Sequence, residues 1–158
     1  MTIAKILLAG LATSALMLAF DGFAVKFEGL PPAVQETARA HMENAFPVSI
    51  MSTQGEKGWD YQVNTRLNGK YHNLVINEQG KLEAVKDETD LASIPAAAKA
   101  AIEKQAASSK IVTLEKVTEG AQVSYGALVK DEAQGKFVQV RVGADGTVKS
   151  KDQGEHGK

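Results

Sequence analysis

The chain of 158 residues contains no cysteine. Disulfides, thiolate nucleophiles, zinc-thiolate sites and a lipidated cysteine are therefore excluded together. An excess of one charge sign is missing too. The net charge is -1, with lysines and acidic residues interspersed along the chain, whereas a nucleic-acid-binding protein normally carries a basic stripe that matches the phosphates. We therefore expect no nucleic-acid partner.

The common catalytic motifs are also missing. The sequence has no Gly-x-Ser-x-Gly elbow, no phosphate-binding glycine-rich loop followed by Lys-Ser or Lys-Thr, and no His-Glu-x-x-His. These arrangements place a serine nucleophile, a nucleotide or a catalytic zinc ion. Three histidines are present, His41, His72 and His156. We predict no catalytic residue, no metal site and no cofactor, and hence a protein that is not an enzyme.

Long hydrophobic runs are scarce, and the one that exists lies at the N-terminus. Lys5 precedes an uncharged run from Ile6 to Phe20, and small residues follow at Gly22 and Ala24. This pattern is typical of a secretory signal peptide, here residues 1–24. The run is shorter than the roughly 20 residues that a membrane-spanning helix needs. We expect a secreted or periplasmic protein with no stable membrane anchor after signal cleavage.

The remaining chain repeats itself. Pairs of similar residues recur at a spacing of sixty-four positions, and at sixty-six after a hairpin turn that is longer in the second copy. The pairs include Val48/Val112, Ile50/Leu114, Tyr61/Tyr125, Leu74/Val140, Ile76/Val142 and Gly80/Gly146. A fixed spacing of this kind indicates two copies of one supersecondary unit. We assign residues 25–90 to the first repeat, 91–152 to the second, and 153–158 to a flexible tail.

Each repeat is predicted to begin with a helix. Pro31 and Pro32 suit a first helical turn, where a missing N–H costs nothing, and Pro47 stops the pattern. The second helix enters at Ile94, and its apolar stripe reaches Ala106.

Strands are predicted to follow each helix. Residues from Trp59 to Leu67 alternate between apolar and polar, Asn68-Gly69 is a strong hairpin signal, and return strands follow. The expected fold class is α+β, with two tandem α-β-β-β-β units that form an antiparallel sheet and helices packed on one face. Whether the units share one continuous sheet stays open.

Alternation within the strands assigns side chains to the two faces of the sheet. Apolar residues of both copies should point toward the helices, which leaves a polar sheet face bare of helices. This face carries amphipathic side chains of the kind that interfaces favour. The candidate partner-binding residues are Arg66, Tyr71, Asn73, Phe137, Gln139 and Arg141.

The order of these motifs resembles secreted PepSY-like proteins. The resemblance covers about Lys26 to Asp152. It rests on the helix entries Leu-Pro-Pro-Ala-Val and Ile-Pro-Ala-Ala-Ala, and on the turns Gly80-Lys81-Leu82-Glu83 and Asp145-Gly146-Thr147-Val148. The tandem arrangement is similar to the fold of β-lactamase inhibitory proteins, which grip a partner on a bare concave sheet face. The resemblance implies a non-catalytic extracytoplasmic module, and a peptidase is one partner that it suggests.

Two alternatives remain open at this point. His41, His72 and Tyr61 would lie between helix and sheet, where a pocket could carry a small ligand or a metal. The sequence also leaves open a third possibility, an envelope scaffold that self-associates through its outer strands.

Overall fold

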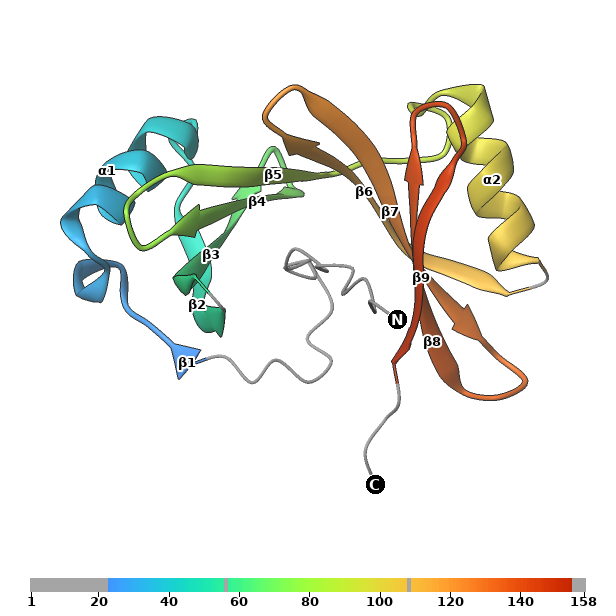
Figure 1. The fold of residues 1–158 in the computed structure, drawn as a ribbon, viewed down its shortest axis with the longest axis horizontal. Coiled ribbons are helices and arrows are strands. Elements are labelled where there is room, and N and C mark those ends of the chain that lie inside the picture. Colours follow the sequence, from blue (N-terminus) through green and yellow to red (C-terminus); the bar gives the residue numbers. More distant parts are fainter. Residues whose placement is uncertain (1–22, 56, 108, 155–158) are drawn as a thin grey trace, which may run out of the picture.

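The computed structural model describes residues 23–55, 57–107 and 109–154 (Figure 1). The elements are β1 (Phe23–Ala24), the 3₁₀ helix η1 (Phe27–Gly29), α1 (Pro32–His41), β2 (Pro47–Gly55), β3 (Gly58–Leu67), β4 (Lys70–Asn77), β5 (Leu82–Glu88), α2 (Ala96–Ala106), β6 (Lys110–Glu119), β7 (Gln122–Asp131), β8 (Lys136–Gly143) and β9 (Val148–Gly154). The strands form one antiparallel sheet in chain order, from β1 to β9. Within the described ranges, neither helix is long and apolar enough to cross a membrane.

The predicted α+β class with a helical layer is wrong, because the fold is mainly β. The sheet has nine strands, whereas α1 has 10 residues and α2 has 11. Helices of this length span about 15 Å, and nine neighbouring strands span roughly 40 Å. Figure 1 shows the two helices at opposite ends of the molecule. The open question of one or two sheets is settled in favour of one.

The predicted segment boundaries differ from the elements at three places. Helix α1 ends at His41, well before Pro47, because Glu43 and Asn44 have positive φ angles of 49° and 69° that a helix cannot contain. The last two residues of the predicted signal peptide form β1, and its residues 1–22 lie outside the described part of the chain. Strand β9 runs to Gly154, so the tail predicted at 153–158 begins in a paired strand. Residues 155–158 lie outside the described part.

Each half of the sheet has its own hydrophobic core. The first core combines α1 with β2 to β4, and the second combines α2 with β6 to β8. The buried members correspond pairwise at spacings of sixty-four or sixty-six: Leu30/Ile94, Val34/Ala98, Ala38/Ile102, Met42/Ala106, Ile50/Leu114, Val63/Ala127, Leu74/Val140 and Ile76/Val142. On α1 the larger residue is Val34 and the smaller is Ala38, whereas on α2 the smaller Ala98 comes first and the larger Ile102 follows. Each helix therefore still fills its site with one branched side chain from this pair of positions.

The correspondence extends to irregular backbone. β-Bulges interrupt β2 between Pro47 and Ser49 and β6 between Ile111 and Thr113, at matching positions. The turn after each return strand contains a glycine with positive φ, Gly80 at 82° and Gly146 at 84°.

The two halves meet where β5 pairs with β6, which we call the seam. The pairs run from Val85↔Thr118 to Glu88↔Glu115. The backbone N–H of Thr89 then donates to the carbonyl oxygen of Leu114 at 2.9 Å. The seam therefore joins the two halves, each with its own core, into one continuous sheet.

Candidate functional site

The register of the strands defines the sheet face opposite the two cores, which we call the bare face. Leu74 and Val140 belong to the helix-bearing cores, and the next residue along each strand points the other way. One row of paired residues crosses this face from Asn64 through Asn73, Lys86 and Val117 to Ser124. The bare face thus continues across the seam from the first half to the second.

The six predicted binding residues lie on this face in two groups. Arg66, Tyr71 and Asn73 lie on β3 and β4, whereas Phe137, Gln139 and Arg141 lie on β8. Strands β5, β6 and β7 separate the groups. The structure therefore does not bring the six residues into one cluster.

Within the first group, Arg66 and Tyr71 form a stacked pair. The guanidinium carbon of Arg66 lies 4.1 Å from the centre of the Tyr71 ring, and Arg66 Nη1 donates to the carbonyl oxygen of Gly69 at 2.9 Å. The Tyr71 residue keeps 37% of its surface exposed. A fixed aromatic side chain of this kind loses little entropy when a partner covers it.

Within the second group, Arg141 is largely engaged by the protein itself. Its Nε donates to Ser124 Oγ at 2.8 Å and its Nη2 to a Glu119 carboxylate oxygen at 2.6 Å. Only 11% of its side chain is exposed. Arg141 is therefore better placed to orient the second half of the face than to bind a partner.

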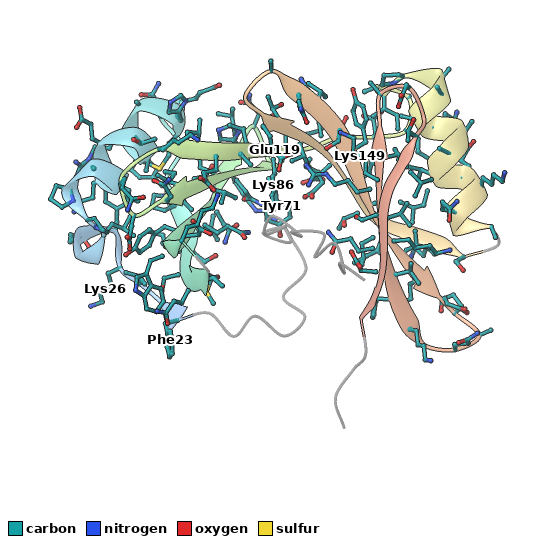
Figure 2. All side chains as sticks on the ribbon, viewed as in Figure 1. Phe23, Lys26, Tyr71, Lys86, Glu119 and Lys149 are labelled. Atoms are coloured by element: carbon teal, nitrogen blue, oxygen red, sulfur yellow. The ribbon has the colours of Figure 1, made fainter. Side chains whose placement is uncertain are left out.

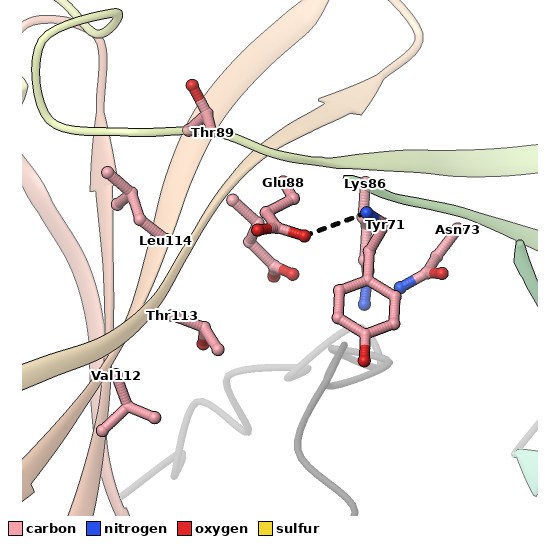
Figure 3. A pocket seen from close by; sticks show the side chains of 9 residues that line it. Tyr71, Asn73, Lys86, Glu88, Thr89, Val112, Thr113 and Leu114 are labelled. Atoms are coloured by element: carbon pink, nitrogen blue, oxygen red, sulfur yellow. Dashed lines mark hydrogen bonds between the residues drawn. The ribbon is translucent and has the colours of Figure 1, made fainter. Parts of the chain in front are cut away.

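A pocket lies on the bare face at the seam (Figure 3). Its volume is about 140 Å³, and side chains of both halves line it. The lining residues are Tyr71, Asn73, Lys86, Glu88, Thr89, Val112, Thr113, Leu114 and Glu115. The bulge in β6 contributes directly, because Val112 has no pairing partner on β7 and lines the pocket. In Figure 2, Tyr71 and Lys86 lie near the middle of the molecule, where the halves meet.

The pocket is the part of the site that sequence reasoning missed. It includes Tyr71 and Asn73 from the predicted set, but also Lys86, Glu88 and Glu115. Glu115 becomes a neighbour of Lys86 and Glu88 only through pairing of β5 with β6, which has no local sequence signature. Alternation along the last strand of the first repeat is the signal that could have pointed to Lys86 as a residue of the same face as Asn73.

Lys86 gives the pocket its unusual electrostatics. The residue is only 5% exposed. Burial lowers the pKa of its ammonium group to about 8, a shift that the Glu115 carboxylate opposes and the Arg141 guanidinium favours. Glu88 and Glu115 lie directly opposite each other across the seam, where like charges repel. The Lys86 ammonium group, two residues along β5 on the same face, offsets part of this repulsion.

On the other face, His72 fastens the end of α1 to the sheet. Its Nδ1 lies 2.6 Å from an Asp87 carboxylate oxygen, and its Nε2 lies 2.9 Å from the carbonyl oxygen of His41. Both partners are acceptors, so both ring nitrogens must donate, which requires the protonated imidazolium. Burial lowers the pKa of His72, but these hydrogen bonds and the charges of Asp87 and Glu43 outweigh it, and the net pKa is raised.

This arrangement bears on the alternative of a carrier pocket between helix and sheet. His41 contributes its backbone carbonyl and His72 is engaged on both nitrogens, while Tyr61 packs against the first core. The 140 Å³ pocket lies on the opposite face. In the part of the chain that the structure describes, no group of three or more His, Asp or Glu side chains could hold a metal ion.

Comparison with known proteins identifies the fold. No family model and no curated protein matches the sequence. A protein from Bacteroides eggerthii, provisionally assigned to the periplasm, matches with a TM-score of 0.66 and 16% identity over 78% of this chain and 88% of its own. A DUF2874 family protein from Bacteroides ovatus matches with a TM-score of 0.64 and 16% identity over 78% of this chain and 87% of its own.

The class of fold follows from a third match. A BLIP-like protein from Bacteroides fragilis matches with a TM-score of 0.58 and 14% identity over 80% of this chain and 87% of its own. The chain therefore has a BLIP-like fold, that is, one similar to β-lactamase inhibitory proteins. At these identities the likeness shows the fold alone, and the resemblance to PepSY-like proteins is not shown by it.

Proposed function

We propose that this protein is a non-catalytic, extracytoplasmic binding module that holds a protein or peptide partner on its bare face, centred on the seam pocket. The observation that carries the proposal is the pocket itself, which both halves build around a buried lysine and an exposed tyrosine. The BLIP-like fold and the periplasmic description of structural neighbours support the same class of function and the predicted secreted or periplasmic location.

The size of the pocket favours a partner side chain over a free ligand. Pockets for drug-sized ligands and cofactors measure about 300 to 1,000 Å³, whereas this one measures about 140 Å³. A volume of this size accepts one side chain. The neighbouring Tyr71 and Arg66 are residue types that dominate interface energetics, so the pocket and the stacked pair together form the anchor point of the proposed interface.

The finer part of the proposal is that the partner is a peptidase that the module restrains. This part rests on the resemblance to PepSY-like proteins. It is tested by adding the purified module to the captured partner and measuring whether peptide hydrolysis slows. Hydrolysis that continues at the same rate would remove the inhibitor role and leave the binding module in place.

The binding proposal is tested by quantitative capture from envelope extract. We expect the double variant Arg66→Ala/Tyr71→Ala to bind its partner at least tenfold more weakly than the wild type, since interface anchors of this kind contribute more than about 1.4 kcal/mol. The matched control is Glu36→Ala/Lys104→Ala, which removes two exposed charges from the helices. Equal capture by both double variants would contradict the site. Thermal unfolding of each variant excludes loss of the fold.

A further inference from the structure

The seam has a second, incomplete copy within the same chain. At the seam, Asp87 pairs with Lys116 and Glu88 with Glu115. At the start of the sheet, β1 pairs with β2 through Phe23↔Ser52 and Ala24↔Met51. Each of these β1–β2 pairs is the corresponding seam pair shifted by sixty-four positions.

The hydrogen bond that follows these pairs is repeated as well. Val25 N–H donates to the carbonyl oxygen of Ile50 at 3.0 Å, and Thr89 N–H donates to that of Leu114 at 2.9 Å. Strand β1 therefore takes the place on β2 that the end of β5 takes on β6. It is much shorter than β5, since it has 2 residues instead of 7.

The other end of the sheet presents the matching strand. By the spacing of sixty-six, β9 corresponds to β5, and β9 is the last strand in the sheet order. Applying the seam register to β9 and to β2 of a second copy gives the pairs Lys151↔Gln54, Asp152↔Thr53, Gln153↔Ser52 and Gly154↔Met51. The last two pairs involve the β2 residues that β1 covers.

We propose that copies of this chain associate head to tail by pairing β9 of one copy with β2 of the next, and that β1 blocks this pairing. The predicted signal cleavage after Ala24 removes Phe23 and Ala24, which are the whole of β1. Processing then frees Met51 and Ser52 for the neighbouring copy. Because the two edges differ, the contact is heterologous and builds an open filament or a closed ring of copies.

Charge on β9 does not argue against this pairing. Charged edge residues commonly protect a sheet from association, and β9 carries Lys151 and Asp152. Strand β5 carries Lys86, Asp87 and Glu88 at the positions that correspond to Asp152, Gln153 and Gly154, however, and it still pairs with β6. The β2 residues Met51 to Gln54 are uncharged, so the new pairing also avoids the opposed glutamates of the seam.

The outward-facing backbone groups of β2 permit a sharp test. Hydrogen-bonded pairs alternate along an antiparallel ladder, and Ile50 bonds to Val25, so Ser52 and Gln54 also direct their N–H groups outward. Proline is tolerated at such edge positions because no internal hydrogen bond is lost. Gln54→Pro therefore removes an intermolecular donor and keeps the β2–β3 pairing, and Gln54→Ala is its matched control.

The experiment measures molar mass by light scattering across protein concentrations. It compares two preparations. The shorter chain starts at Val25 and lacks β1, and the longer chain starts at Phe23 and keeps every described element. We expect the shorter chain to associate at least tenfold more tightly than the longer one, and Gln54→Pro but not Gln54→Ala to abolish that association. A monomeric shorter chain, equal association of both chains, or association that survives Gln54→Pro would each overturn the proposal.

This inference is independent of the proposed function. Arg66→Ala/Tyr71→Ala lies on the bare face, whereas Gln54→Pro changes an edge. Loss of partner capture and loss of self-association are therefore separable outcomes. Far-ultraviolet circular dichroism of each preparation verifies that the sheet is intact.

Discussion

The two halves of the sheet hold their helices by different means. In the first half, Thr37 Oγ1 donates to the carbonyl oxygen of Gly80 at 2.5 Å, and His72 Nε2 bonds to the carbonyl oxygen of His41 at 2.9 Å. In the second half the corresponding positions are Ala101 and Val138, which pack against the second core. The same backbone thus accepts a polar or an apolar attachment of the helix. The polar attachment adds a dependence on pH that the apolar one lacks.

A feature common to both halves should give the largest effect. A Cβ at Gly80 would lie 2.7 Å from the Ala33 carbonyl oxygen, and one at Gly146 would lie 2.7 Å from that of Ala97. We expect Gly80→Ala and Gly146→Ala each to lower the free energy of unfolding by about 3 kcal/mol, through backbone strain and a clash with the helix. Urea denaturation measures the change.

The matched control for this prediction is Gly69→Ala. Gly69 has nearly the same φ as Gly80, 81° against 82°, but its Cβ would meet no atom within 4 Å. Only strain remains, and the expected cost is about 1 kcal/mol. Equal losses at Gly69 and Gly80 would show that close approach of the turn to the helix contributes nothing.

The seam should give the next largest effect, through Lys86. Its pKa of about 8 in the folded protein lies below the 10.5 of an unperturbed lysine. Between these values the unfolded chain binds more protons, so the free energy of unfolding should rise with pH, by on the order of 3 kcal/mol. Lys86→Met should abolish this rise. The exposed Lys116→Met should keep it, and a rise that survives in Lys86→Met would refute the assignment.

The smallest effect should come from the polar attachment of the first half. The raised pKa of His72 means that its stabilising effect is complete below pH 6.5 and is lost as the pH rises through the folded-state value. At pH 6, His72→Val should cost about 1 to 3 kcal/mol, since hydrogen bonds of a charged group are lost. The difference in unfolding free energy between the wild type and His72→Val should become smaller at higher pH. Asp87→Asn should weaken the pH dependence as well, and an unchanged slope in both variants would contradict the role of the pair.

Local features of this fold could be predicted from the sequence. Asn68-Gly69 was expected to form a tight hairpin turn, and both residues have positive φ angles, 51° and 81°. Strand alternation placed Leu74 and Val140 toward the helices, and both are buried in the two cores. These features depend on a few neighbouring residues, and backbone sterics or the two-residue period of a strand decides them.

Features that depend on distant parts of the chain could not be predicted. The expected α+β class overestimated helices that end after 10 and 11 residues. The pocket needs Lys86 and Glu115 side by side, and only the edge pairing at the seam creates that neighbourhood. Strand β1 could not be predicted, because its two residues belong to the predicted signal peptide. Edge pairing is carried by main-chain groups that every sequence has, so it leaves little trace in side-chain patterns.

The strand order has a consequence for how this protein folds. Every strand of the described sheet lies beside its neighbours in the chain. Six of the eight connections are turns of two to four residues, and only the β1–β2 and β5–β6 connections contain a helix. Topologies with local contacts fold faster than those that join distant segments. The sheet can therefore grow in the direction of synthesis, one strand at a time. Each new strand covers the edge left by the previous one, which shortens the time during which a nascent edge is open to aggregation.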